Sequence, residues 1–132
     1  MKIILALFIT IVATTTMARA SGGEQARCEV AWESYDWFSM AVHCKIAAED
    51  AAYLAHITND NDTKAVRLAQ AALDQILGVL GERREGIDDN IDTDYAAAQH
   101  YMHTARILPV SSTTRRMIDS SKRLYDQIDA RL

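Results

Sequence analysis

The segment between residues 64 and 80 constrains the fold of this chain most strongly, because its apolar side chains recur at alternating steps of three and four residues. The residues of this series are Val66, Ala69, Leu73, Ile76 and Leu80, widened by Ala65, Leu68, Ala72 and Leu77. The polar residues that fall outside the series are Lys64, Arg67, Gln70 and Asp74. This spacing predicts an amphipathic helix whose single apolar face is wide enough to pack into the core of a helical bundle.

The N-terminal 20 residues have the three parts of a secretory signal peptide. Lys2 supplies a positive charge, residues 3–13 are almost wholly apolar, and Ala18-Arg19-Ala20 provides a cleavage site before Ser21. The apolar run is shorter than the roughly 20 residues that cross a bilayer, so we expect cleavage rather than anchoring. The prediction is a signal peptide over 1–20 and a single helical domain over 21–132, exported to the periplasm or secreted.

Length and charge exclude several classes of function. A chain of 132 residues favours one domain. The formal net charge is −4, and it becomes more negative once Lys2 and Arg19 leave with the signal peptide. Because nucleic-acid backbones require clustered Lys and Arg, we expect no nucleic-acid binding. We also expect no integral membrane segment after signal cleavage, whereas the oligomeric state, homo-oligomers included, is left open.

Four helices are predicted after the signal peptide. They cover residues 24–57, 63–84, about 92–108 and about 112–132. Proline disfavours helical geometry in the residue before it, so the third helix ends before Pro109, and Ser111 or Ser112 can cap the fourth. Gly78 and Gly81 are expected to weaken the end of the second helix. Polar loops and the lack of a strand pattern indicate an all-α, small up-down four-helix bundle.

The first predicted helix has two apolar faces. The larger side chains lie on one face: Tyr35, Phe38, Val42, Ile46, Tyr53 and Ile57. The opposite face carries Trp37, Ala41, Cys44, Ala48, Ala51, Ala52 and Ala55. Such a helix can lie inside the bundle with its aromatic residues in the core, or it can pack its alanine face and offer its aromatic residues to a partner. The candidate interaction residues for that second case are Trp32, Tyr35, Trp37, Phe38 and Tyr53.

Cys28 and Cys44 give conflicting indications. In an exported protein the two cysteines are expected to pair. In one continuous helix they would lie about 24 Å apart, whereas a disulfide requires Cα atoms within about 7 Å. Either the chain before Ser34 folds back, with Ser34 as the N-cap of a helix that begins at Tyr35, or the cysteines pair between chains, or they stay reduced. We favour the internal disulfide.

Few residue patterns indicate chemistry. His100 and His103 share one flank of a helix, as two metal ligands would, but no third ligand accompanies them, so we expect surface histidines and no metal site. Glu49 and His56 lie two turns apart beside Lys45 and could serve as acid and base, but no nucleophile or oxyanion site accompanies them. A C-x-x-C-H motif for covalent haem is missing, and no cofactor is predicted.

These patterns favour a protein that works by binding rather than by catalysis. The first hypothesis is an accessory or adaptor protein of the cell envelope or extracellular space that binds a protein partner through its aromatic N-terminal part, from Trp32 to Tyr53. The second hypothesis is a carrier that holds a small apolar ligand or a metal between its helices. The third and least favoured is an enzyme that uses Glu49 and His56.

Overall fold

A computed structural model describes residues 23–132, so the predicted signal peptide and its cleavage site lie outside the described residues. The described chain is all-α, which confirms the predicted fold class. Its elements are α3 (Gly23–Glu33), α4 (Trp37–Ser39), the π-helix η1 (Met40–Cys44), α5 (Lys45–His56), α6 (Asn61–Glu85), α7 (Ile91–Ile107) and α8 (Ser112–Asp129). Because α4, η1 and α5 follow one another without a gap, they form one continuous helix, and the described residues contain five helices rather than four.

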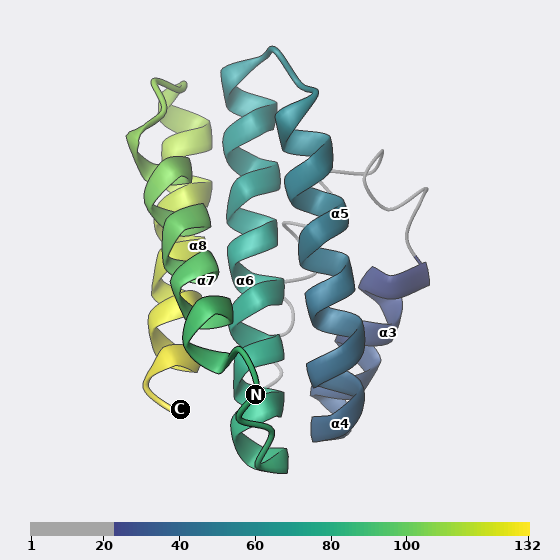
Figure 1. The fold of residues 1–132 in the computed structure, drawn as a ribbon. Helices are drawn as coiled ribbons and strands as arrows, with labels where there is room; N and C mark the ends of the chain where they lie inside the picture. Colours follow the sequence, from purple (N-terminus) through teal and green to yellow (C-terminus); the bar gives the residue numbers. More distant parts are fainter. Residues whose placement is uncertain (1–22) are drawn as a thin grey trace.

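Helix α6 lies at the centre of the bundle, in contact with α5, α7 and α8 (Figure 1). Nearly every residue from Ala65 to Glu82 is buried, on all sides of the helix. The predicted apolar face is buried in the core, but the helix has no exposed polar face at its middle, because Gln70 and Asp74 are 2 % and 0 % exposed. The reason is α3, which packs against this flank of α6 and covers its polar positions with residues such as Gln25.

The chain reverses between α3 and α4, as an internal disulfide requires. Tyr35 takes the left-handed backbone conformation at φ 56°, which turns the chain back on itself. The reversal brings the Cα atoms of Cys28 and Cys44 to 4.6 Å, and their sulfur atoms form the internal disulfide. The predicted helix over 24–57 is therefore two helices, which a disulfide joins side by side.

The capping residue at this turn differs from the predicted one. The Ser34 hydroxyl donates a hydrogen bond to the carbonyl oxygen of Val30 at 2.8 Å, so Ser34 closes α3 instead of opening the next helix. Asp36 is the N-cap of α4, because its carboxylate accepts hydrogen bonds from the backbone nitrogen and the hydroxyl of Ser39. The Ser39 contacts also hold the pKa of Asp36 below its ordinary value. The expectation for Ser34 is wrong because two residues are needed to reverse the chain before a helix can begin.

Gly78 and Gly81 allow the continuous helix over 37–56 to approach α6 closely. A Cβ on Gly81 would lie 2.4 Å from the carbonyl oxygen of Trp37 and 2.7 Å from the backbone nitrogen of Ala41. A Cβ on Gly78 would lie 2.5 Å from Cγ of Lys45. Helix α6 continues through both glycines to its end at Glu85, close to the predicted end at residue 84. These glycines let the helix over 37–56 approach α6 closely: a Cβ would collide with backbone atoms at Gly81 and with the side chain of Lys45 at Gly78.

The remaining helix ends agree with the turn chemistry of the sequence. The Asp60 carboxylate accepts a hydrogen bond from the backbone nitrogen of Thr63 at 2.8 Å and caps α6, and Ser111 caps α8 in the same way. Gly86 ends α6 with a φ of 73°, a conformation that glycine adopts without strain. The Asp62 carboxylate in the first turn of α6 accepts a hydrogen bond from the Ser111 backbone nitrogen at 3.1 Å. This contact joins the start of α6 to the start of α8.

Candidate interaction surface

A row of apolar side chains lies exposed along the outer side of the helix over residues 37–56 and its C-terminal cap. We call this row the outer stripe, and it consists of Phe38, Val42, Ile46, Tyr53 and Ile57. Their exposed fractions lie between 37 % and 64 %. They recur at multiples of the helical period, so they share one line along the helix that is about 29 Å long.

The opposite side of the same helix explains why the stripe points outward. The buried residues on that side are Ala41, Cys44, Ala47, Ala48, Ala51 and Ala55. Alanine allows close packing against α6, and Cys44 is joined to α3 by the disulfide. With α6 on one flank and α3 on another (Figure 1), the larger apolar side chains remain on the flank that neither helix covers.

The structure separates the predicted interaction residues into an exposed and a buried group. Tyr35, Phe38 and Tyr53 are exposed. Trp32 is 1 % exposed and belongs to the hydrophobic core, so the expectation that it faces a partner is wrong. Trp32 is buried because the chain reversal turns this side of α3 onto the bundle, and helical periodicity alone does not reveal that packing.

Trp37 lies between these two groups. Trp37 is half-buried, and its ring centroid lies 5.6 Å from the ring centroid of Tyr35. The guanidinium carbon of Arg84 lies over the Trp37 ring, 5.7 Å from the ring centroid. The stripe residues that sequence reasoning did not select are Val42, Ile46 and Ile57. These three residues have the same helical spacing as Phe38 and Tyr53, but only aromatic residues were predicted to bind a partner. The complete line of apolar residues on this face is the signal that indicates them.

Two acidic residues interrupt the outer stripe at its middle. Glu49 and Asp50 follow Ile46 and precede Tyr53, and the helical period places them on opposite sides of the apolar line. Within residues 23–132 neither carboxylate forms an ion pair. Burial, reinforced by the charge of Glu49, raises the pKa of Tyr101 on α7. The middle of the stripe is therefore negatively charged.

A second set of charges joins three helices beside the stripe. The Lys45 Nζ atom lies 3.2 Å from a carboxylate oxygen of Glu82 on α6 and 3.0 Å from one of Asp94 on α7. Burial lowers the pKa of Lys45, but its hydrogen bonds to the two carboxylates outweigh burial and leave that pKa raised. Burial, reinforced by Asp94, raises the pKa of Glu82 to about 7 in spite of Lys45. These contacts hold the Lys45 ammonium group toward α6 and α7, away from the stripe.

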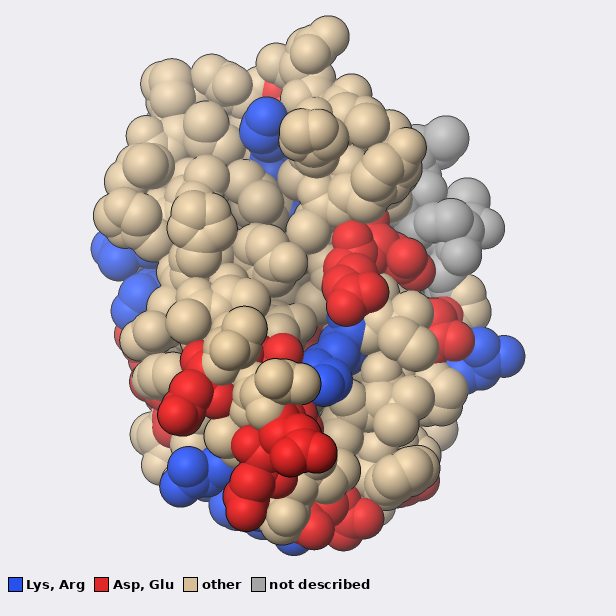
Figure 2. All heavy atoms as spheres, in the orientation of Figure 1, with Lys and Arg blue, Asp and Glu red and all other residues tan. Residues whose placement is uncertain are grey.

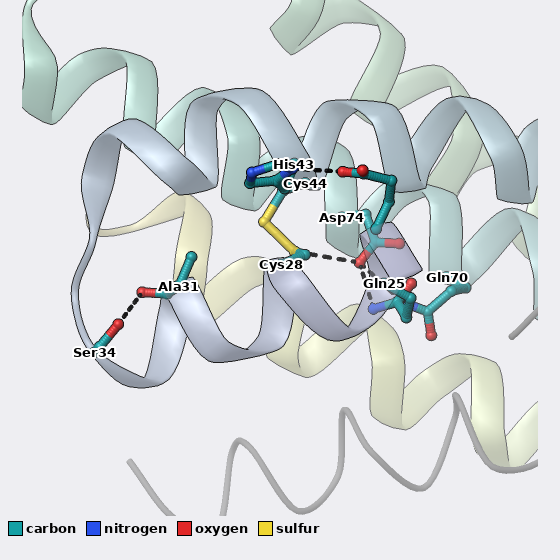
Figure 3. The surroundings of a disulfide bond; sticks show 9 residues. Gln25, Cys28, Ala31, Ser34, His43, Cys44, Gln70 and Asp74 are labelled. Atoms are coloured by element: carbon teal, nitrogen blue, oxygen red, sulfur yellow. Dashed lines mark hydrogen bonds and ion pairs between the residues drawn. A yellow bond between two sulfur atoms is a disulfide. The ribbon is translucent and has the colours of Figure 1, made fainter. Parts of the chain in front are cut away.

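A buried carboxyl group lies beside the disulfide (Figure 3). The Oδ1 atom of Asp74 accepts hydrogen bonds from the side-chain amides of Gln25 at 3.1 Å and Gln70 at 3.0 Å. The disulfide sulfur of Cys28 lies 3.8 Å from the same oxygen. Burial raises the pKa of Asp74 well above its ordinary value, against the effect of the two amides. The hydrogen bond between Gln25 and Asp74 links α3 to α6. Because Asp74 is 0 % exposed, its carboxyl group is not accessible to a substrate.

The residues of the catalytic and metal hypotheses are exposed and lie apart. Glu49 and His56 are separated by about 10 Å along their helix, which is too far for a direct hydrogen bond. His100 and His103 are exposed on α7. Within residues 23–132, no group of three His, Cys, Asp or Glu side chains is placed to hold a metal ion. The described residues thus give these two hypotheses no specific support.

Comparisons with known proteins do not indicate a function. No protein-family model, curated protein or solved structure matches this chain. In the described part of the chain, none of the helices is both long enough and apolar enough to cross a membrane. The function of the chain must therefore be inferred from the chemistry of its own surface.

Proposed function

We propose that this chain is an exported, non-catalytic helical-bundle protein that acts by binding another protein through the outer stripe. The observation that supports the proposal is the row of exposed apolar side chains on a helix whose other flanks are packed. Single exposed apolar residues are common on protein surfaces, whereas here five lie in one line, in two groups on either side of Glu49 and Asp50, and apolar patches bordered by polar residues are typical of interaction sites. Phe38 and Tyr53 add aromatic side chains, which bury a large area at low entropic cost and are frequent at binding hot spots.

Export and fold topology belong to the same proposal. A signal peptide removed after Ala20 would deliver the chain to an oxidising compartment, where the disulfide between Cys28 and Cys44 can persist. In the delivered protein, the helix over 37–56 forms an up-down four-helix bundle with α6, α7 and α8, and α3 is an additional helix that the disulfide attaches to it. Intact mass spectrometry tests this proposal. We expect a chain that begins at Ser21 and gains two hydrogens on reduction; retention of residues 1–20, or two free thiols, would contradict it.

Substitution of stripe residues tests the binding proposal. The variant Phe38→Ser/Tyr53→Ser removes both aromatic side chains of the stripe, which are 57 % and 64 % exposed. The matched control is Ile107→Ser, because Ile107 is also 64 % exposed but lies at the end of α7. Each purified protein is immobilised and used to retain partners from cell-envelope and culture-medium extracts of the source organism, and the retained proteins are identified by mass spectrometry.

We expect one protein to be retained by the wild type and by Ile107→Ser but not by Phe38→Ser/Tyr53→Ser. The stripe variant should keep the circular dichroism spectrum and the unfolding midpoint of the wild type. Equal retention by the stripe variant would show that binding uses another surface. Unfolding of the stripe variant would show that Phe38 and Tyr53 belong to the core, and the proposal would be wrong.

A further inference from the structure

The charges within the outer stripe indicate what kind of partner it binds, an inference that rests on the proposed binding function. We infer that the stripe binds an amphipathic helix of another protein, and that the apolar row of this partner helix carries a Lys or Arg near its middle. The surface to be covered runs from Phe38 to Ile57, which corresponds to about 29 Å, or about five turns of a partner helix.

Glu49 and Asp50 create the need for a basic residue. They flank the apolar line at its middle, so a helix that covers the stripe comes to lie over both carboxylates and removes part of their water. Burying a charge without a partner is unfavourable, and neither residue has an ion-pair partner within residues 23–132. A Lys or Arg of the partner at this level supplies the opposite charge, and the planar guanidinium of Arg can donate hydrogen bonds to both carboxylates.

The cation that precedes the acidic pair on the same helix does not neutralise this site. Lys45 lies one turn before Glu49, but its ammonium group is held by Glu82 and Asp94. The lack of a side chain at Gly78 leaves the space in which the stem of Lys45 lies. Figure 2 shows acidic side chains over the middle of α5 and over the start of α7, with basic atoms between the two groups, and the acidic groups cover the larger part of this surface. Charge complementarity therefore favours a basic partner.

A second copy of this chain is a poor occupant of the stripe. In an antiparallel pairing centred on the stripe, Glu49 and Asp50 of both copies fall within about 8 Å along the shared axis. In a parallel pairing they face each other directly. Either arrangement brings four carboxylates together, and like charges placed opposite each other disfavour association. An anionic lipid surface is disfavoured for the same reason, because such surfaces attract basic segments rather than acidic ones.

A photo-crosslinker within the stripe can identify what covers it. The substitution Tyr53→p-benzoylphenylalanine keeps an aromatic side chain at an exposed position close to the acidic pair. The full chain is expressed in its source cells, irradiated and purified under denaturing conditions, and the cross-linked peptides are sequenced by mass spectrometry. The charge reversal Glu49→Lys/Asp50→Lys is introduced into the same background. Its control, Asp88→Lys/Asp89→Lys, reverses a second adjacent acidic pair, which is exposed in the turn before α7, whereas in the stripe Glu49 is exposed and Asp50 is half-buried.

We expect a cross-link to another protein, in a segment with apolar residues at helical spacing and a Lys or Arg within about one turn of the linked residue. Reversal of Glu49 and Asp50 should lower the yield of this cross-link by at least about tenfold, whereas reversal of Asp88 and Asp89 should leave it unchanged. A linked segment without Lys or Arg, or a yield that survives the reversal at Glu49 and Asp50, would overturn the inference and leave the proposed function intact. A cross-link to a second copy would also overturn the inference. A cross-link to lipid, or none at all, would overturn both.

Discussion

The substitution Gly81→Ala tests whether α6 and the helix over 37–56 are held at a separation that only glycine permits. The added Cβ would lie 2.4 Å from the carbonyl oxygen of Trp37 and 2.7 Å from the backbone nitrogen of Ala41. Unstrained contacts of this kind lie at about 3.5–4.0 Å, so the two helices would have to separate by about 1 Å. Both contacting atoms belong to the backbone of a packed helix, which cannot rotate away as a side chain can.

Two opposing effects decide the size of the change. Replacing Gly by Ala inside a helix favours folding by about 1 kcal/mol. Forcing added volume into a packed interior costs about 1–3 kcal/mol. The upper end of this range applies because Met40 has to move as well. Its Cβ would lie 2.9 Å from the new methyl group, and its side chain is 0 % exposed. We expect a net loss of about 1–2 kcal/mol in the free energy of unfolding, which lowers Tm by about 4–12 °C in a domain of this size.

The matched control is Gly78→Ala. Its Cβ would meet Cγ of Lys45 at 2.5 Å and the Lys45 backbone nitrogen at 3.4 Å, so Lys45 has to change rotamer but the helix backbone need not move. That change loosens the ion pairs of Lys45 with the buried Glu82 and with Asp94; because the Lys45 side chain is 32 % exposed and keeps contact with water, we expect a loss of about 1 kcal/mol, so gain and loss nearly cancel. Urea unfolding followed by circular dichroism gives both free energies. Equal stability of Gly81→Ala and Gly78→Ala would refute the reasoning, because the two sites differ mainly in whether backbone or side chain opposes the new methyl group.

Three further perturbations have defined outcomes. Replacing Cys28 and Cys44 together by Ala opens a loop that spans 16 residues, and the expected loss is about 3 kcal/mol in urea unfolding, whereas a loss below about 0.5 kcal/mol would contradict the chain-entropy account. Glu82→Gln should flatten the stability profile between pH 4.5 and 7. The folded pKa of Glu82, about 7, lies above the ordinary 4.5, so Glu82 contributes stability that is complete below pH 4.5 and is lost as the pH rises through 7, by up to about 3 kcal/mol. The exposed control Glu85→Gln should leave that profile unchanged. Asp74→Asn keeps an oxygen that accepts both amide hydrogen bonds. Because burial raises the pKa of Asp74, the stability of this variant relative to the wild type should increase as the pH rises above about 4; a stability difference that stays constant or falls as the pH rises would contradict this prediction.

Local chemistry was sufficient to predict the helices from α6 onward. The polar residues 58–60 before α6, Gly86, Pro109 and the cap at Ser111 act through backbone preferences and short-range hydrogen bonds that do not depend on the rest of the fold. The predicted ends of these helices therefore lie within three residues of the observed ones. The internal disulfide between Cys28 and Cys44 could also be favoured from the sequence. Its 16-residue spacing then requires the chain to reverse between the two cysteines, because one continuous helix would hold them too far apart.

The helical period is enough to show that the five stripe residues share one line of a helix and that alanines occupy the opposite face. Which of these faces is covered depends on packing between helices. Small residues let the backbone of the helix over 37–56 approach α6 at Gly81, and α3 then covers the flank of α6 that carries Gln70 and Asp74. Periodicity shows which side chains share a face, but the neighbour that covers a face is set by contacts between distant residues. For that reason Trp32 became part of the core, while Phe38 and Tyr53 remained at the surface.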